Sequence, residues 1–353
     1  MSNAEPIRLG LAGVGRAGWG MHVPELEGLE HLFKIVAACD VDPARCAKIA
    51  DKLGCKTCTD LKDLIADPDV ELVDIATRST DHLAHTLAAL KAKKWVFLEK
   101  PMCVTYAEAV KLRKAARGRL FVRHNRRFEP GFQHIREIMG SGLLGEVFEI
   151  KLRRNGYGRR DDWQTLIACG GGQLLNWGPH VIDHALRLLE SPVKEIWSDL
   201  KCIAAVGDAE DHLRIALKGV NGRIVDLQIS GGAAVREPEY IVLGTKGGLV
   251  GSGNTISLRY LDPEVKLEPR QPNPGTPPEG GFGSPDDLKW IEETIEVAPA
   301  MACNMKDSIW IALYNAIRKG TSFPIKLDES VEVMRIISAV KKGTPFEAKK
   351  KKM

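Results

Sequence analysis

Uninterrupted apolar runs alternate with amphipathic segments through the first part of the chain. The clearest run is Trp95 to Leu98, which passes without interruption into Glu99, Lys100 and Pro101. Such runs are typical of strands covered on both faces, as in parallel sheets between helices. We therefore predict a doubly wound, mostly parallel sheet with strands at residues 7–12, 33–39, 71–76, 95–98 and 120–123, and helices at residues 21–29, 43–53, 60–66, 80–92, 106–116 and 131–139.

The pattern changes after Gly145. Shorter runs separated by turn signals such as Asn221-Gly222 and Gly247-Gly248 predict a largely antiparallel sheet. Because the chain has 353 residues, we expect two domains, at residues 1–125 and 126–353, with C-terminal helices able to pack back on the first. The second domain has expected strands at 146–153, 194–203, 212–218, 222–230, 239–244 and 254–261, helices at 170–190, 303–319 and 328–341, and a proline-rich surface loop at 263–285.

A glycine-rich turn follows the first predicted strand. Gly13, Gly15 and Gly18 form the motif G-x-G-x-x-G, in which glycine permits a tight turn, close approach of a pyrophosphate and close packing of helix on strand. Asp40 ends the next strand roughly 20 residues later, at the spacing of an acid that binds the adenosine ribose. Alternatively, Asp40 caps the helix that opens at Pro43.

Polar side chains gather at the predicted carboxyl ends of the parallel strands, where open α/β sheets bind ligands. Thr77 and Arg78 follow one strand, while Glu99 and Lys100 end the central one. His82 lies in the first turn of the helix between them. A first-turn histidine is more often solvated or a cap, but this one faces the expected ligand edge.

Composition and charge argue against several kinds of protein. The formal net charge is +4, and the C-terminal lysines of KKKKM lack the aromatic residues and reader motifs of nucleic-acid binding. The eight cysteines show no disulfide frame, and the C-x-x-C of Cys55 and Cys58 lacks the further ligands of a metal site. No segment reaches the roughly 18 apolar residues of a membrane span. We expect a cytoplasmic protein that binds neither nucleic acid nor membrane.

The helical segment at residues 170–190 carries a histidine suited to proton transfer. Oxidation of a secondary alcohol needs a hydride acceptor on one side of the carbon and a base on the other. Pro179 is suited to begin a helix, which would place His180 in a first turn where the helix dipole disfavours the imidazolium. Asp183 shares that helix face and could orient the ring, while Lys100 could stabilise a developing alkoxide.

Two segments allow more than one interpretation. His180, Asp183 and His184 could instead form a buried polar cluster. The two histidines could also bind a metal at i, i+4 spacing, although the sequence shows no third ligand. The run from Arg153 to Trp163 is either a solvated loop or the rim of a pocket.

Together these motifs resemble the Gfo/Idh/MocA family, the oxidoreductases named for glucose-fructose oxidoreductase and inositol dehydrogenase. The resemblance spans nearly the whole chain and rests on GVGRAG, Asp40, ALKAKKWVFLEKP, NRRFEP, GGGQLLNWGPHVID and LGTKGGL. It implies an α/β fold with an N-terminal Rossmann domain and a C-terminal α+β domain. The large, mostly antiparallel open sheet of the latter would cover the active site and mediate a homo-dimer or homo-tetramer.

The resemblance also implies the roles of individual residues. Lys100 would contact substrate and nicotinamide ribose, His180 would be the acid/base, and Asp183 would support it. Asn176 stands where the common family form has aspartate. We expect NAD contacts from Gly13, Gly15, Arg16, Ala17, Asp40, Thr77, Arg78, His82, Glu99, Lys100 and Asn125, substrate contacts from Lys100, Arg127, Trp163, Asn176 and His180, and no metal.

The expected function is an NAD-dependent dehydrogenase acting on a secondary alcohol of a sugar, polyol or glycoside. Two alternatives stay open: a glycosidase or lyase of the same fold that recycles bound NAD, and a sensor that binds NAD without turnover. The presence of both Lys100 and His180 favours an enzyme. NAD is expected over NADP because Asp40 would repel a 2′-phosphate, and Arg45 is the residue that would oppose this preference.

Overall fold

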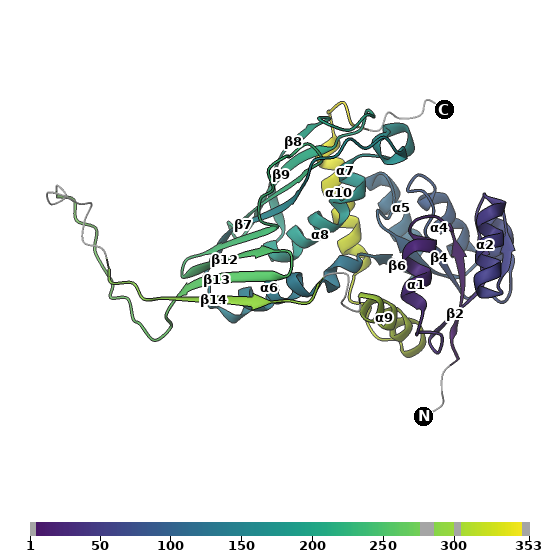
Figure 1. Cartoon of the computed structure of the whole chain (residues 1–353), viewed down its shortest axis with the longest axis horizontal. Coiled ribbons are helices and arrows are strands. Elements are labelled where there is room, and N and C mark those ends of the chain that lie inside the picture. Colours follow the sequence, from purple (N-terminus) through teal and green to yellow (C-terminus); the bar gives the residue numbers. More distant parts are fainter. Residues whose placement is uncertain (1–4, 276–285, 300–304, 348–353) are drawn as a thin grey trace.

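The computed structural model describes residues 5–275, 286–299 and 305–347, with residues 305–308 described by their backbone alone. Cys303, the KKKKM sequence and part of the proline-rich stretch lie outside this description. Two sheets organise the chain, with helices between and around them (Figure 1).

The first sheet has six parallel strands in the order β3-β2-β1-β4-β5-β6, which confirms the predicted doubly wound arrangement. Sequence reasoning missed only β3, because three residues carry no readable period. The strands are β1 (Ile7–Ala12), β2 (Phe33–Cys39), β3 (Lys56–Cys58), β4 (Leu72–Ile75), β5 (Trp95–Glu99) and β6 (Leu120–Arg123).

Local signals account for the ends of the helices around this sheet. Asp42 caps one helix by accepting from the amide of Ala44, and Thr105 with Glu108 forms a capping box on another. The helix after the glycine turn is shorter than predicted, since a π-helical turn precedes it. The elements are η1 (Gly18–His22), α1 (Val23–Leu26), α2 (Pro43–Leu53), α3 (Leu61–Ala66), α4 (His82–Lys91), α5 (Tyr106–Ala116), η2 (Asn125–Phe128) and α6 (Pro130–Ser141).

The second sheet has eight strands in the order β14-β13-β12-β11-β7-β10-β9-β8, antiparallel except for β7 with β10. It confirms the predicted mostly antiparallel sheet and adds two strands. Gly247 and Gly248, read as a turn, instead open β12, and the turn is at Thr245-Lys246. The strands are β7 (Val147–Asn155), β8 (Val193–Lys201), β9 (His212–Gly219), β10 (Ile224–Ser230), β11 (Tyr240–Gly244), β12 (Gly247–Ser252), β13 (Thr255–Leu261) and β14 (Trp290–Glu296).

The single helix predicted over residues 170–190 is divided. Short turns η3 (Trp163–Thr165) and η4 (Ile167–Cys169) precede α7 (Gln173–Asn176), and α8 (Gly178–Leu189) follows after Trp177. Pro179 stands at the start of α8, where its missing N–H interrupts the bonding of the preceding turn. The chain therefore bends immediately before His180.

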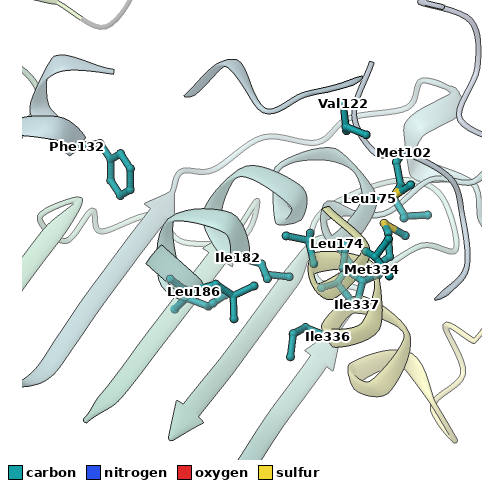
Figure 2. Close-up of a cluster of buried hydrophobic side chains, with 14 of the residues drawn as sticks. Met102, Val122, Phe132, Leu174, Leu175, Ile182, Leu186, Met334, Ile336 and Ile337 are labelled. Carbon is teal, nitrogen blue, oxygen red and sulfur yellow. The ribbon is translucent and has the colours of Figure 1, made fainter. Parts of the chain in front are cut away.

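The two C-terminal helices, α9 (Met305–Lys319) and α10 (Leu327–Lys341), lie against the first sheet's domain (Figure 1). Trp310 of α9 is fully buried among Phe33 and Phe97, with ring centroids 5.3 and 4.9 Å away. Helix α10 also contacts α8, and Figure 2 shows Met334 and Ile337 beside Leu174 in one apolar cluster. Helix α10 thereby joins the two parts of the chain in a common core.

Beyond the second sheet, the segments that follow β13 and precede β14 extend away from the body of the molecule (Figure 1). Their described residues, 262–275 and 286–289, are mostly exposed, in agreement with the predicted surface loop. Within the described residues, no helix has the length and apolar character needed to cross a membrane.

Candidate active site

The glycine turn after β1 leaves room for a phosphate. Gly13 has φ +97°, and a Cβ there would lie 2.6 Å from the carbonyl oxygen of Ala76, so only glycine fits. A Cβ on Gly15 would meet only Arg45 Nη1 within 4 Å, at 3.6 Å. Gly15 therefore faces open space, and Arg16 and Ala17 separate it from the start of η1 at Gly18. This cradle fits the pyrophosphate of a dinucleotide.

Asp40 lies beside this turn rather than on the helix after it. Its Oδ2 accepts the amide of Val14 at 2.8 Å, and its Oδ1 accepts the amide of Asp42 at 3.0 Å. Asp42 is the cap of α2, so the interpretation of Asp40 as that cap is wrong. Arg45, half exposed, places its Nη1 3.5 Å from Asp40 Oδ2. The adenosine end of the expected site therefore holds an acid and an arginine together.

Lys100 lies directly after β5, at the carboxyl edge of the first sheet. Its Nζ donates to the backbone oxygen of Asn176 at 3.0 Å, which joins this edge to the end of α7. Burial lowers the pKa of Lys100 to about 8, and the nearby cations Arg16 and Arg126 act in the same direction against Glu99. The ammonium is thus held at the boundary of the two domains.

His180 is buried in the first turn of α8, as the sequence predicts. Its Nδ1 has no hydrogen-bond partner among the described residues. Burial, followed by the charges of Lys100 and Arg126, holds the pKa of His180 well below its ordinary value. The imidazole is therefore neutral near pH 7 and able to accept a proton.

Asp183 does not orient His180 as expected. Its two carboxylate oxygens accept from Nε and Nη2 of Arg127, each at 2.6 Å. Arg127 in turn donates through Nη1 to Glu329 of α10 at 2.5 Å. The side chain of Arg127 is only 9% exposed, and its expected contact with substrate stays a prediction. These residues bind α8 to η2 and α10 instead.

Two expected cofactor contacts are turned into the protein. His82 is buried, with Nδ1 2.7 Å from the carbonyl oxygen of Pro101 and Nε2 3.1 Å from that of Thr77. Glu99 is also buried, and its Oε2 accepts the amide of Lys100 at 2.9 Å. Both side chains are therefore engaged within the protein at the sheet edge, and their expected contacts with NAD stay predictions.

A buried charge network that sequence reasoning missed holds Glu99 in place. His22 contacts Asp74 through Nδ1 at 2.7 Å and Glu99 through Nε2 at 3.0 Å. Burial alone would lower the pKa of His22, but the two carboxylates raise it to about 9. Arg123 donates to Glu99 and Glu25, each at 2.5 Å. The sequence offered only two signals of this network: a histidine four residues past the glycine motif, and an arginine at the end of an apolar strand.

His124 was also missed. It follows β6, and because Glu99 pairs with Arg123 in register, His124 lies beside Lys100 along the sheet edge. It is buried, its Nδ1 has no partner among the described residues, and burial lowers its pKa to about 4. The sequence places His124 directly before the NRRFEP segment, but nothing in it indicates that His124 lies beside Lys100.

The remaining predicted residues surround this edge. Thr77 shares a hydrogen bond of 3.0 Å with His85, and Asn125 is buried at the start of η2. Arg78 stacks over Trp163, 5.6 Å from the ring centroid, so the 153–163 run approaches the ligand edge. These contacts favour the pocket-rim interpretation of that run over a solvated loop.

Two clefts flank the bend between α7 and α8. The bend places His180 in one and Asn176 in the other. The first cleft is lined by Arg126, Glu129, Leu152, Arg153, Arg154, Trp177, His180, Val181, His184, Glu239 and Tyr240. The second is lined mainly by polar residues that include Arg160, Gln164, Thr165, Gln173, Asn176, Glu210 and Asp211.

His184 serves the structure of the first cleft. Its Nδ1 lies 3.0 Å from the hydroxyl of Tyr240 and its Nε2 3.0 Å from the carbonyl oxygen of Arg126. Both ring nitrogens are thereby engaged. The part of the chain that the structure describes holds no group of His, Cys, Asp and Glu suited to a metal ion.

Comparison with known proteins agrees with this geometry. Residues 7–122 match the oxidoreductase family GFO_IDH_MocA with its NAD-binding Rossmann fold, and residues 132–250 match the GFO/IDH/MocA C-terminal domain. An uncharacterized oxidoreductase of Schizosaccharomyces pombe is 30% identical over 299 residues, which cover 79% of this chain and 76% of that protein.

Two further proteins are similar over nearly their whole length. The scyllo-inositol 2-dehydrogenase (NADP(+)) IolW of Bacillus subtilis is 25% identical over 347 residues, covering 95% of this chain and 93% of that one. The crystal structure of an NAD-binding protein from Listeria innocua superposes with a TM-score of 0.80 at 23% identity, covering 97% of this chain and 98% of that one. Site, fold and sequence agree: the chain belongs to the Gfo/Idh/MocA family of NAD(P)-binding oxidoreductases.

Proposed function

We propose that the protein is an NAD-dependent dehydrogenase that oxidises a secondary alcohol of a sugar or polyol. The observation that carries this proposal is the bond of Lys100 Nζ to Asn176 at 3.0 Å, which brings the ammonium to the bend that presents His180. A cation and a neutral imidazole from different domains meet at one edge. The dehydrogenase activity of the Bacillus relative on an inositol supports the same substrate class.

The chemistry divides between cofactor and protein. Bound NAD supplies the hydride acceptor, and the cradle at Gly15 with Asp40 would hold it. Lys100 would orient the substrate hydroxyl and stabilise the oxygen as it loses its proton. His180, whose low pKa keeps the ring neutral, would accept that proton.

The preference for NAD rests on Asp40. Its carboxylate, fixed by the amides of Val14 and Asp42, would accept from the ribose hydroxyls and repel a 2′-phosphate. Arg45 would oppose this repulsion if it turned from Asp40 toward the phosphate. The ratio of dissociation constants for NADH and NADPH measures the preference. Equal or tighter NADPH binding contradicts it, and Asp40→Ser is expected to move the ratio toward NADPH.

A substrate screen tests the reaction itself. The protein is incubated with NAD and a panel of sugars, polyols and glycosides, and NADH absorbance is followed together with product formation. We expect NADH to accumulate with at least one compound. Turnover of a glycoside without NADH would establish the recycling alternative, and cofactor binding without any turnover would favour a sensor.

A further inference from the structure

We propose that the substrate carries an anionic group, a carboxylate or a phosphate, which Arg126 and Arg154 bind beside His180. The inference rests on the proposed function and deepens it, because it narrows the sugar or polyol to an acidic one. Both arginines line the cleft that contains His180.

The two guanidinium groups share one aromatic support. The central carbon of Arg126 lies 4.3 Å from the centroid of the Trp177 ring, and that of Arg154 lies 3.9 Å from it. Trp177 is the bend residue between α7 and α8, and its ring meets His180 edge-on at 5.9 Å. Stacking on an aromatic face fixes a guanidinium plane and leaves its edge free to donate.

Each of the two arginines retains unused donors. Arg126 bonds to Glu129 through Nη1 alone, and Arg154 bonds to Glu239 through Nη1 alone, at 2.8 Å. A guanidinium has five N–H donors, and the Nε and Nη2 groups of both make no hydrogen bond to the described residues. These groups match the two oxygens of a carboxylate or the oxygens of a phosphate.

The sequence neighbours of these arginines are saturated. Arg127 spends Nε and both Nη groups on Asp183 and Glu329. Arg153 does the same with Asp226, Glu237 and backbone oxygens. Both are largely buried. Unused donors are therefore particular to Arg126 and Arg154, and Arg153 has none although it lines the same cleft.

The charge at the site also favours an anion. Lys100 reaches a backbone oxygen of Asn176, and Glu99 is engaged by His22, Arg123 and a backbone amide. The cations Lys100 and Arg126 lower the pKa of His180, and the carboxylates Glu129 and Glu239 line the same cleft. Glu129 and Glu239 each engage only one nitrogen of Arg126 and Arg154, so an acidic sugar would meet free guanidinium donors and gain charge-assisted bonds that a neutral sugar lacks.

Calorimetric titration of the NADH-loaded protein tests this without requiring turnover. The ligands are matched sets: glucose with glucuronate and glucose 6-phosphate, and galactose with galacturonate and galactose 6-phosphate. We expect one acidic member to bind at least about tenfold more tightly than its neutral partner, a preference that salt reduces. The carboxylate and phosphate members distinguish the two anions.

Four variants are compared with the wild type, with folding verified by thermal denaturation. Arg126→Gln and Arg154→Gln should each remove most of the preference, and Arg154→Lys should keep part of it because the charge remains. Arg136→Gln is the matched control, since Arg136 is exposed on α6 and outside the cleft. Equal binding of neutral and acidic members, binding of no acidic member, or a preference that survives both glutamine variants overturns the proposal.

NADH formation is measured in parallel to separate this inference from the proposed function. Equal oxidation of neutral and acidic sugars would overturn the anion site and leave the dehydrogenase in place. Arginine-dependent binding of an acidic sugar, without NADH from any compound, would support the anion site and contradict the dehydrogenase.

Discussion

Lys100 is a single cation held between the two sheets. Its position follows from β5 on one side and from the backbone oxygen of Asn176 on the other. Because the ammonium lies at the expected site of alkoxide formation, its charge matters most as the hydroxyl proton leaves.

We expect Lys100→Met to lower turnover by roughly a hundredfold or more while the NADH dissociation constant changes by no more than a few-fold. Steady-state kinetics on an identified substrate and fluorescence titration of NADH provide the measurements. Lys91→Met, at an exposed position on α4, is the control. Near wild-type turnover in Lys100→Met would show that another group stabilises the oxygen.

His180 sets the expected dependence of oxidation on pH. Its pKa is lowered by burial and by Lys100, so the rate should fall on acidification only below the roughly 6.5 of free histidine. Asn176→Asp would add a negative charge near the bend and should move this limb to higher pH. Alanine at His180 should remove the limb with most activity. A limb that survives in His180→Ala would mean that another group is the base.

The sequence predicted which residues lie at the carboxyl edge of the first sheet, but it did not predict their hydrogen-bond and ion-pair partners. Lys100 and His180 were predicted from a strand end and a helix start, which are local signals. Arg127, Glu99 and His82 were placed near the same edge, but their partners come from distant parts of the chain. A one-dimensional pattern contains no signal for such pairings, so none of these partners was predicted.

Among the elements, helix α8, which carries His180, is held by ion pairs as well as by apolar packing. Arg127 of η2 joins Asp183 of α8 to Glu329 of α10, and all three side chains are largely buried. Removing one member of such a group leaves the others buried without a partner, which typically costs about 3–5 kcal/mol.

Arg127→Met should therefore lower the free energy of unfolding by about 3 kcal/mol and leave KM for substrate within a few-fold of wild type. Denaturant unfolding and steady-state kinetics at a permissive temperature measure the two effects. An exposed pair such as Arg113 with Asp328 supplies the comparison, because Arg113→Met should cost less than about 1 kcal/mol. A large rise in KM with unchanged stability would instead support Arg127 as a substrate contact.

At the bend before α8, local sequence signals predict the helix start but not the break that precedes it. Pro179 marks a helix start, yet the continuous apolar periodicity of residues 170–190 concealed the break at Trp177. In the same way, paired glycines imitate a turn at β12, where they are instead fitted against Tyr260 and Val242 of neighbouring strands. Close packing between strands selects glycine for a reason that sequence alone cannot separate from turn formation.

At the scale of the whole molecule, one face of the second sheet has no helices on it (Figure 1). Trp197, Ile224, Val250 and Trp290 are all between 39% and 56% exposed. The strand register places them on the same face, opposite Ile150, Leu152 and Tyr240. We propose that this face pairs two copies of the chain as a homo-dimer, or as half of a homo-tetramer.

Light scattering after gel filtration tests this assembly. Trp197→Glu should shift the mass toward the monomer, because a carboxylate on the shared face would be desolvated in the dimer. Val220→Glu, at an exposed turn, is the control and should leave the mass unchanged. A monomeric wild type at micromolar concentration would contradict the assembly.

Because of the network around His22, we expect the free energy of unfolding to fall as the pH becomes alkaline. The pKa of His22 is raised to about 9, so its contribution is complete below about 6.5 and is lost as pH rises through about 9. The shift corresponds to roughly 3 kcal/mol. Denaturant unfolding should show this loss between pH 7 and 10 in the wild type. His22→Gln should be less stable at pH 7 and lose less over the same interval.

The same histidine constrains how an activity can be detected. Alcohol oxidation releases a proton, so alkaline buffer favours NADH accumulation and is the natural choice for a screen. Above about pH 9, however, the ring between Asp74 and Glu99 loses its charge, and two buried carboxylates then face each other one residue from Lys100. Because the pKa of Lys100 is about 8, its ammonium has also lost its charge at this pH. A screen in strongly alkaline buffer would therefore favour the reaction at equilibrium but slow its catalysis, and the turnover of a true substrate would be underestimated.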